Sequence, residues 1–205
     1  ALGAHASAVA CTVSIDATTV FGDSHDETLY LSSAKSIAAG DGYTAANLPG
    51  TPPQTKYPPL YSYLLAVVWL FSSNLQTAVV LAQALNIALS GLWLVGVFYL
   101  LRGRCSDKVA LGVTAIVAVQ PISSILAARI LSDVGFAALL TWSCVLAQRA
   151  SARRVLSIVG MALVCAATTA LRTLGVFGAI GIAGWAVTRR RYALAATAII
   201  AGTLP

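Results

Sequence analysis

One uncharged run, from Leu75 to Leu101, most constrains what this chain can fold into. As an α-helix it is roughly 40 Å long, at ~1.5 Å per residue, whereas the hydrocarbon core of a bilayer is roughly 30 Å thick. Hydrophobic residues make up 58% of the chain and charged residues only 10%, which is not the composition of a water-soluble domain. The sequence therefore predicts an integral membrane protein.

Further apolar segments follow this run and predict an all-α, multi-pass bundle of transmembrane helices over residues 75–205. Val109–Ala128 is a second uncharged stretch, and another segment begins at Tyr192. Three shorter segments lie between them: Val134–Gln148, Val155–Leu171 and Thr173–Thr188. The chain begins with Ala1 rather than Met and stops inside the last apolar segment. We therefore expect it to be a piece of a longer polypeptide.

The basic residues gather between apolar segments, which is typical of cytoplasmic loops in membrane proteins. Their placement does not suggest a groove for nucleic acid. With every cluster on the cytoplasmic side, Arg129, Asp133 and Arg172 lie at the outer face. The clusters are Arg102/Arg104/Lys108, Arg149/Arg153/Arg154 and Arg189–Arg191.

The first third of the chain divides differently. Residues 1–15 are mildly apolar and are expected to end a preceding transmembrane helix, and residues 16–74 form an external loop. Within the loop, Glu27–Ala39 has the pattern of an amphipathic helix on the outer surface, ended by Gly40 and Gly42. Tyr57–Phe71 is short and aromatic, which favours a juxtamembrane or re-entrant helix. If this segment crosses instead, Asp26 and Asp133 face opposite sides of the membrane.

The external loop carries most of the acidic residues. Asp26 and Glu27 are adjacent and follow His25, and such carboxylates could act as a general base or hold a divalent cation. The alternative is a solvated turn, in which Asp26 caps a helix and Glu27 suits its positive end.

Three further charged residues are candidates for the same site. Lys56 precedes the rigid segment Tyr57-Pro58-Pro59 and suits an anionic headgroup, or is a snorkelling lysine at the membrane interface. Asp133 either pairs with Arg129 or converges with Asp26 and Glu27 in an external cavity. Arg172 marks a tight external turn or reaches a phosphate. Gly175, Gly178, Gly181 and Gly184 follow it as a small-residue face for helix packing.

These residues, in this order, resemble the membrane glycosyltransferases of the GT-C fold. The matching motifs, between about Gly22 and Arg191, are Asp26-Glu27-x-x-Tyr30, Lys56-Tyr57-Pro58-Pro59-Leu60-Tyr61, Ile130-Leu131-Ser132-Asp133 and Leu171-Arg172-x-x-Gly175. Within that fold they are most similar to the dolichyl-phosphate-mannose protein mannosyltransferases and to the bacterial aminoarabinose and lipopolysaccharide-core sugar transferases.

The resemblance implies a reaction, its partners and a location. A sugar on a polyprenyl phosphate passes to a hydroxyl acceptor at the outer face of a bacterial plasma membrane. Asp26 is then the catalytic base with Glu27 beside it, and Lys56 and Arg172 bind the donor phosphate. Asp133 is the acidic residue of the second external loop and shapes the site. The further candidates are His25, Tyr30, Tyr57 and Arg129, and a divalent cation, if one is used, would lie among Asp26, Glu27 and Asp133.

Two other functions fit a chain of this kind. A transporter or flippase of lipid-linked sugars would carry charges in the middle of helices that line a pathway. Here the charges fall at the ends of apolar segments, which favours the enzyme. A non-catalytic relative that binds a lipid-linked sugar is the third alternative.

Overall fold

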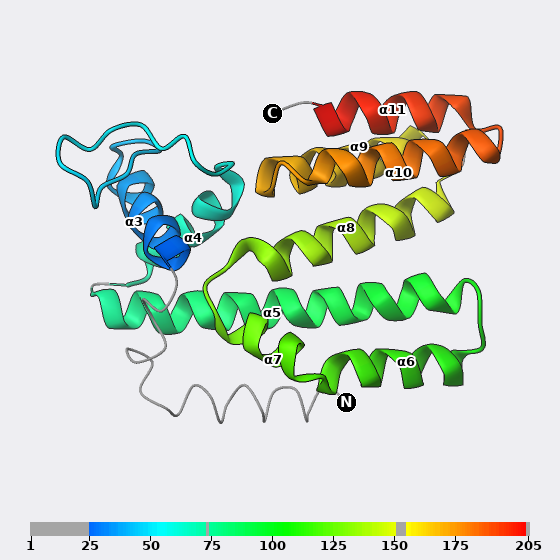
Figure 1. Ribbon diagram of the computed structural model, residues 1–205, viewed down its shortest axis with the longest axis horizontal. Coiled ribbons are helices and arrows are strands. Elements are labelled where there is room, and N and C mark those ends of the chain that lie inside the picture. The colour runs from blue at the N-terminus through cyan, green and yellow to red at the C-terminus, as the bar shows by residue number, and fades with distance from the viewer. Residues whose placement is uncertain (1–24, 73, 151–154, 204–205) are drawn as a thin grey trace.

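Every regular element in the described part of the chain is an α-helix, as the sequence predicts (Figure 1). The computed structural model describes residues 25–72, 74–150 and 155–203. The predicted end of a preceding helix, residues 1–15, lies outside them. The helices are α3 (His25–Ala39), α4 (Leu60–Leu70), α5 (Leu75–Arg102), α6 (Asp107–Val119), α7 (Pro121–Ala128), α8 (Ser132–Arg149), α9 (Val155–Leu171), α10 (Gly175–Thr188) and α11 (Tyr192–Thr203).

The longer helices lie side by side and alternate in direction (Figure 1). Helices α5, α8 and α10 run one way, and α6, α9 and α11 run back. The described basic clusters follow α5, α8 and α10, so they share one end of the bundle, whereas α3 and α4 lie at the other. We call these the basic end and the α3 end.

Only α5 is by itself long and apolar enough to cross a membrane, among the described helices. It has 28 residues. A second crossing would result if α6 and α7 counted as one bent span, while α4, α9, α10 and α11 are apolar but shorter. One membrane-crossing helix is therefore supported by length and composition, and the multi-pass topology stays a prediction.

The stretch 109–128, expected to cross as one segment, is two helices that meet at 61°. The break falls at Gln120, whose ψ of 139° is extended, and α7 begins with Pro121. A proline has no amide hydrogen to donate and disfavours the helical conformation of the residue before it. Pro121 is thus the physical reason for the bend.

Helix α3 forms where the sequence predicts it, and one face of the helix is buried against the rest of the protein. Its apolar residues pack into one cluster with α4, α5, the chain before α8 and the last residue of α9. The cluster contains Tyr30, Leu31, Ala34, Tyr61, Leu65, Ala66, Val79, Ala82, Ile130 and Leu171. The helix ends as predicted, with Gly40 and Gly42 at φ of 89° and 80°, a left-handed conformation that glycine adopts readily. Its buried side chains fix α3 against the rest of the α3 end.

Helix α4 is too short to cross a bilayer as a straight helix. Its 11 residues extend only about 16 Å. It begins at Leu60, directly after Pro58 and Pro59, and belongs to the same buried cluster as α3. It is shorter than the predicted segment Tyr57–Phe71, and its juxtamembrane position stays a prediction.

The glycines of α10 divide into two kinds. A Cβ on Gly175 would lie 2.5 Å from the backbone nitrogen of Thr169, and one on Gly178 would lie 2.4 Å from Leu140. These two glycines permit close packing on α9 and α8, as predicted. A Cβ on Gly181 or Gly184 would meet nothing within 4 Å, so the small-residue face is only half used for packing.

Candidate functional site

Asp26 lies in the first turn of α3 and contacts the rigid segment before α4. The Tyr57 hydroxyl donates to its carboxylate at 2.5 Å, and the Lys56 ammonium lies 3.3 Å from the same oxygen. The Asp26 and Lys56 side chains are 40% and 51% exposed, so both remain open to a ligand. The ammonium also lies 4.8 Å from the centre of the Tyr57 ring. Pro58 and Pro59 restrict this segment and so help to fix its distance from α3.

These contacts shift the pKa values of Asp26 and Lys56. The hydroxyl of Tyr57, with a smaller contribution from Lys56, holds the pKa of Asp26 below its ordinary value although partial burial opposes this. The proximity of Tyr57 and Asp26 raises the pKa of Lys56. At neutral pH the pair therefore consists of a carboxylate and an ammonium ion.

Asp133 pairs with Arg172, whereas sequence spacing offered Arg129 as one of two alternatives. Asp133 is in the first turn of α8, and Arg172 directly follows α9. The Arg172 guanidinium donates to the Asp133 carboxylate and lies 6.0 Å from the centre of the Phe136 ring. The two side chains are 34% and 39% exposed. The second pair is thus also accessible.

Tyr30 joins the two pairs. Its ring lies 4.8 Å from that of Tyr57 and 4.9 Å from that of Tyr61. Its hydroxyl shares a hydrogen bond of 3.1 Å with Ser132, the residue before Asp133. Burial raises the pKa of Tyr30 to about 12, so the hydroxyl stays protonated at neutral pH. One side chain therefore connects α3 and the segment before α4 to the start of α8.

Glu27 and His25 are placed differently from their neighbour Asp26. Glu27 is only 1% exposed, and its carboxylate accepts the backbone N–H of Ile130 at 3.3 Å. Its position suits anchoring the chain before Asp133 better than contact with a substrate. His25 is exposed at the start of α3. Arg129 follows α7 and is half-buried.

Asn86 organises the site and was missed by the sequence analysis. It is fully buried in α5, accepts the Tyr61 hydroxyl at 2.9 Å, and donates to the carbonyls of Arg129 and Leu131. It therefore ties α4 and the chain before Asp133 to the longest helix. The available signal was Gln83, Asn86 and Ser90 at helical spacing within an otherwise apolar run.

Replacing Asn86 with alanine should leave the Tyr61 hydroxyl and two carbonyls without partners. We expect a loss of about 1–3 kcal/mol in unfolding free energy, the usual cost of buried polar groups left unpaired. Thermal unfolding of the purified protein in detergent measures it. The matched control is Gln83→Leu, because the buried Gln83 Oε1 already has no partner. A loss in the control as large as in Asn86→Ala would contradict the role given to Asn86.

Tyr57→Phe should make the stability of the protein less dependent on acid. The pKa of Asp26 is depressed in the folded state. The contribution of Asp26 to folding stability is therefore present above pH 3.8, the ordinary pKa, and is lost as pH falls through the folded pKa. Without the hydroxyl that pKa rises toward 3.8. We expect Tyr57→Phe to be less stable than wild type at neutral pH, with the difference shrinking below about pH 4. Melting curves across pH measure this stability difference, with Tyr63→Phe at an exposed tyrosine as the control. A difference between wild type and Tyr57→Phe that does not change with pH would contradict the prediction.

A groove lies beside the Asp26–Lys56 pair. It has a volume of about 520 Å³ and runs between the segment 55–59 and the neighbouring ends of α9, α10 and α11. Lys56 and Tyr57 form one wall, and Thr169 and Thr173, on either side of Leu171 and Arg172, belong to the other. The lining combines a cation, hydroxyl groups and apolar surface, which suits a ligand with a polar head and an apolar tail.

The structure does not group the carboxylates as a metal site. No set of three or more His, Cys, Asp or Glu residues among residues 25–72, 74–150 and 155–203 lies close enough to hold a metal ion. Asp26 and Asp133 instead contact Lys56 and Arg172. The arrangement is that of two carboxylate–cation pairs.

Comparison with models of known protein families, with curated proteins and with solved structures finds no match to this chain. What fold and site define together is an all-helical protein with at least one helix able to cross a membrane and with two accessible carboxylate–cation pairs at one end.

Proposed function

We propose that this chain is a membrane glycosyltransferase of GT-C type. It moves a sugar from a polyprenyl phosphate to a hydroxyl acceptor at the outer face of a bacterial plasma membrane. The observation that carries the proposal is the presence of two accessible contacts at the α3 end, Asp26–Lys56 and Asp133–Arg172, with a groove lined by Lys56. A sugar phosphate needs both a base for the acceptor and cations for the leaving group, and this region offers both.

The distribution of side chains supports a bundle that crosses the membrane several times. More than half of the buried apolar side chains are alanines, whereas large apolar side chains are exposed along α6, α9, α10 and α11. Leu156, Ile116 and Phe177 are 87%, 67% and 66% exposed. Small residues inside and large ones outside are typical of helices packed in lipid, and such surface in water would be an aggregation liability. The basic clusters then mark the cytoplasmic side.

The reaction is a displacement at the anomeric carbon of the sugar. The acceptor oxygen forms a bond to that carbon as the bond to the phosphate oxygen breaks, and Asp26 accepts the hydroxyl proton. The polyprenyl phosphate leaves with its negative charge stabilised by Lys56 and Arg172. A phosphate leaves as an anion and needs no general acid, which is why cations rather than a second protonated carboxyl group are required.

Donor binding also prepares the base. In the structure the Tyr57 hydroxyl and, more weakly, the Lys56 ammonium keep the pKa of Asp26 low, which makes Asp26 a weak base. A bound phosphate attracts the Lys56 ammonium and adds negative charge nearby. Both effects raise the pKa of Asp26 and strengthen it as a base. Half-exposed ion pairs contribute only about 0–1 kcal/mol, so a phosphate can open this one easily.

The groove supports a lipid-linked donor. Lys56 stands at one wall, and the other wall ends at Val176 and Gly202 between α10 and α11. A phosphate near Lys56 and Arg172 would leave the polyprenyl chain room to follow this apolar side toward the lipid. Threonines on both walls add hydroxyl groups to the lining.

Transport remains the competing function, and the placement of charges argues against it. In α5 to α11 the charged residues of the described chain stand in the first or last turn, at Arg102, Asp107, Lys108, Asp133 and Arg149. A pathway for a charged head group would place charges in mid-helix. Asn86, a fully buried polar residue of α5, is occupied by its hydrogen bonds to protein groups.

The test uses membranes that contain the full-length protein and a panel of polyprenyl-phosphate sugars radiolabelled in the sugar. We expect the label to enter a hydroxyl acceptor while polyprenyl phosphate is released in equal amount. Movement of intact donor across vesicles without release would replace the proposal with transport. Donor binding with neither release nor movement would indicate a non-catalytic binding protein.

A further inference from the structure

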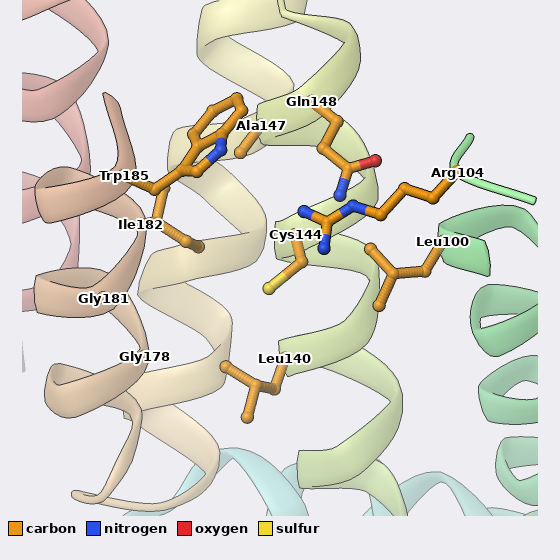
Figure 2. A pocket seen from close by; sticks show the side chains of 10 residues that line it. All are labelled: Leu100, Arg104, Leu140, Cys144, Ala147, Gln148, Gly178, Gly181, Ile182 and Trp185. Atoms are coloured by element: carbon orange, nitrogen blue, oxygen red, sulfur yellow. The ribbon is translucent and has the colours of Figure 1, made fainter. Parts of the chain in front are cut away.

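A second hollow lies at the basic end, far from the site described above. It has a volume of about 430 Å³, within the ~300–1,000 Å³ range of small-molecule sites. Figure 2 shows it between α5, α8 and α10, with Leu140 and Gly178 at one end and Arg104, Gln148 and Trp185 at the other. Neither the candidate site nor its groove shares a residue with it.

The shape of this hollow comes from the glycines of α10. Gly178 lets Leu140 of α8 pack closely, and Gly181, one turn further, leaves its space unfilled. Ile182 and Ala147 are buried beside it, so the walls are apolar. An elongated apolar slot of this kind suits a hydrocarbon chain.

The rim of the hollow is polar and positively charged. The Arg104 side chain reaches from the loop after α5 toward Cys144 and the amide of Gln148 (Figure 2). Unlike Arg102, which pairs with Asp107 at 3.0 Å, Arg104 has no ion-pair partner among the described residues. Among the described residues of this end, Asp107 is the one acidic residue. The basic residues there are Arg102, Arg104, Lys108, Arg149, Arg189, Arg190 and Arg191.

We propose that this hollow binds one anionic phospholipid of the cytoplasmic leaflet. Its phosphate contacts Arg104 and Gln148, and one acyl chain lies in the slot beside Gly181 and Trp185. The guanidinium group matches a phosphate in geometry and charge, and the leaflet on the basic side of a membrane protein is rich in anionic lipids. The inference rests on the membrane topology of the proposed function but not on sugar transfer.

Trp185 provides the measurement because it lines the hollow. The full protein is reconstituted in two kinds of phosphatidylcholine vesicle. One contains a small fraction of phosphatidylglycerol brominated on its acyl chains, and the other contains the same fraction of brominated phosphatidylcholine. Bromine quenches nearby indoles, and subtracting the quenching of Trp185→Phe isolates the share from Trp185. We expect brominated phosphatidylglycerol to quench Trp185 at a lower fraction of brominated lipid in the vesicle than brominated phosphatidylcholine requires.

Two pairs of variants test the two parts of the site. Arg104→Gln should reduce the preference for the anionic lipid about five-fold, the effect of one basic residue at an anionic surface. Arg102→Gln, two residues away and outside the hollow, should not. Gly181→Leu should fill the slot and protect Trp185 from either lipid, whereas Gly184→Leu, equally open but not part of the lining, should not.

The outcomes separate this inference from the proposed function. Equal quenching by the two lipids, equal effects of the two arginine variants, or no effect of Gly181→Leu would each overturn the lipid site, with sugar transfer unaffected. No quenching of Trp185 by either lipid would place the basic end outside the bilayer and would overturn the membrane topology as well. Loss of sugar transfer alone would leave the lipid site standing.

Discussion

Asp26→Asn is expected to reduce sugar transfer by about 10²–10⁴-fold, the usual contribution of a general base. Asparagine has nearly the same shape as aspartate and can still accept the Tyr57 hydroxyl, but it cannot take the acceptor proton. The groove and the cations are unchanged, so donor binding should persist. Radiolabel transfer under saturating donor, together with a separate donor-binding measurement, tests both statements.

The control for this variant is Asp41→Asn. Asp41 is an exposed acid just beyond the end of α3 and contacts neither Asp26 nor Lys56 in the described structure. The Asp41→Asn variant should transfer sugar at the wild-type rate. Full transfer by Asp26→Asn would remove Asp26 as the base. A loss of donor binding equal to the loss of transfer would instead assign Asp26 to binding.

Arg172→Gln is expected to reduce transfer by about 10²–10³-fold, the loss seen when one charge-stabilising donor is removed from a transition state. The effect on stability should be small because the ion pair with Asp133 is half-exposed, and such pairs contribute about 0–1 kcal/mol. Arg172→Lys should recover part of the rate, since the charge returns without the two-pronged geometry of the guanidinium group. Transfer rates and melting temperatures of the same samples measure both effects.

Arg189→Gln is the matched control, because Arg189 directly follows α10 at the basic end, away from the proposed phosphate. Wild-type transfer is expected there. If Arg172→Gln unfolded the protein, the ion pair would be structural and the phosphate role would lose its support. If it transferred sugar at the wild-type rate, the phosphate would have to bind elsewhere.

Local patterns predicted the helices well because apolar periodicity and terminal signals are properties of short segments. Pro58 and Pro59 set the start of α4, and Gly40 and Gly42 set the end of α3. Pro121 carried the same kind of signal, but the uncharged stretch around it led the sequence analysis to treat 109–128 as one segment. The length of an apolar stretch alone was the weaker guide.

Side-chain partners were harder to predict because they depend on packing between distant segments. Arg129 is one helical turn before Asp133 in the sequence, yet Arg172 is the partner because α8 and α9 are antiparallel neighbours. Adjacent residues also separated: Asp26 stays accessible, whereas the helix turn carries Glu27 into the interior. Asn86 was overlooked for the same reason, since its importance comes from three contacts that the sequence does not reveal.

The most direct test of the central claim is the side of the membrane on which Asp26 and Asp133 lie. Single cysteines are placed by Asp26→Cys and Asp133→Cys in a background without the four native cysteines, and the native Cys105 is retained alone as the marker of the basic end. Intact cells are treated with a thiol reagent that does not cross membranes. The account predicts labelling at positions 26 and 133 in intact cells and at Cys105 only after permeabilisation. Labelling of positions 26 and 133 from opposite sides would contradict a shared external site.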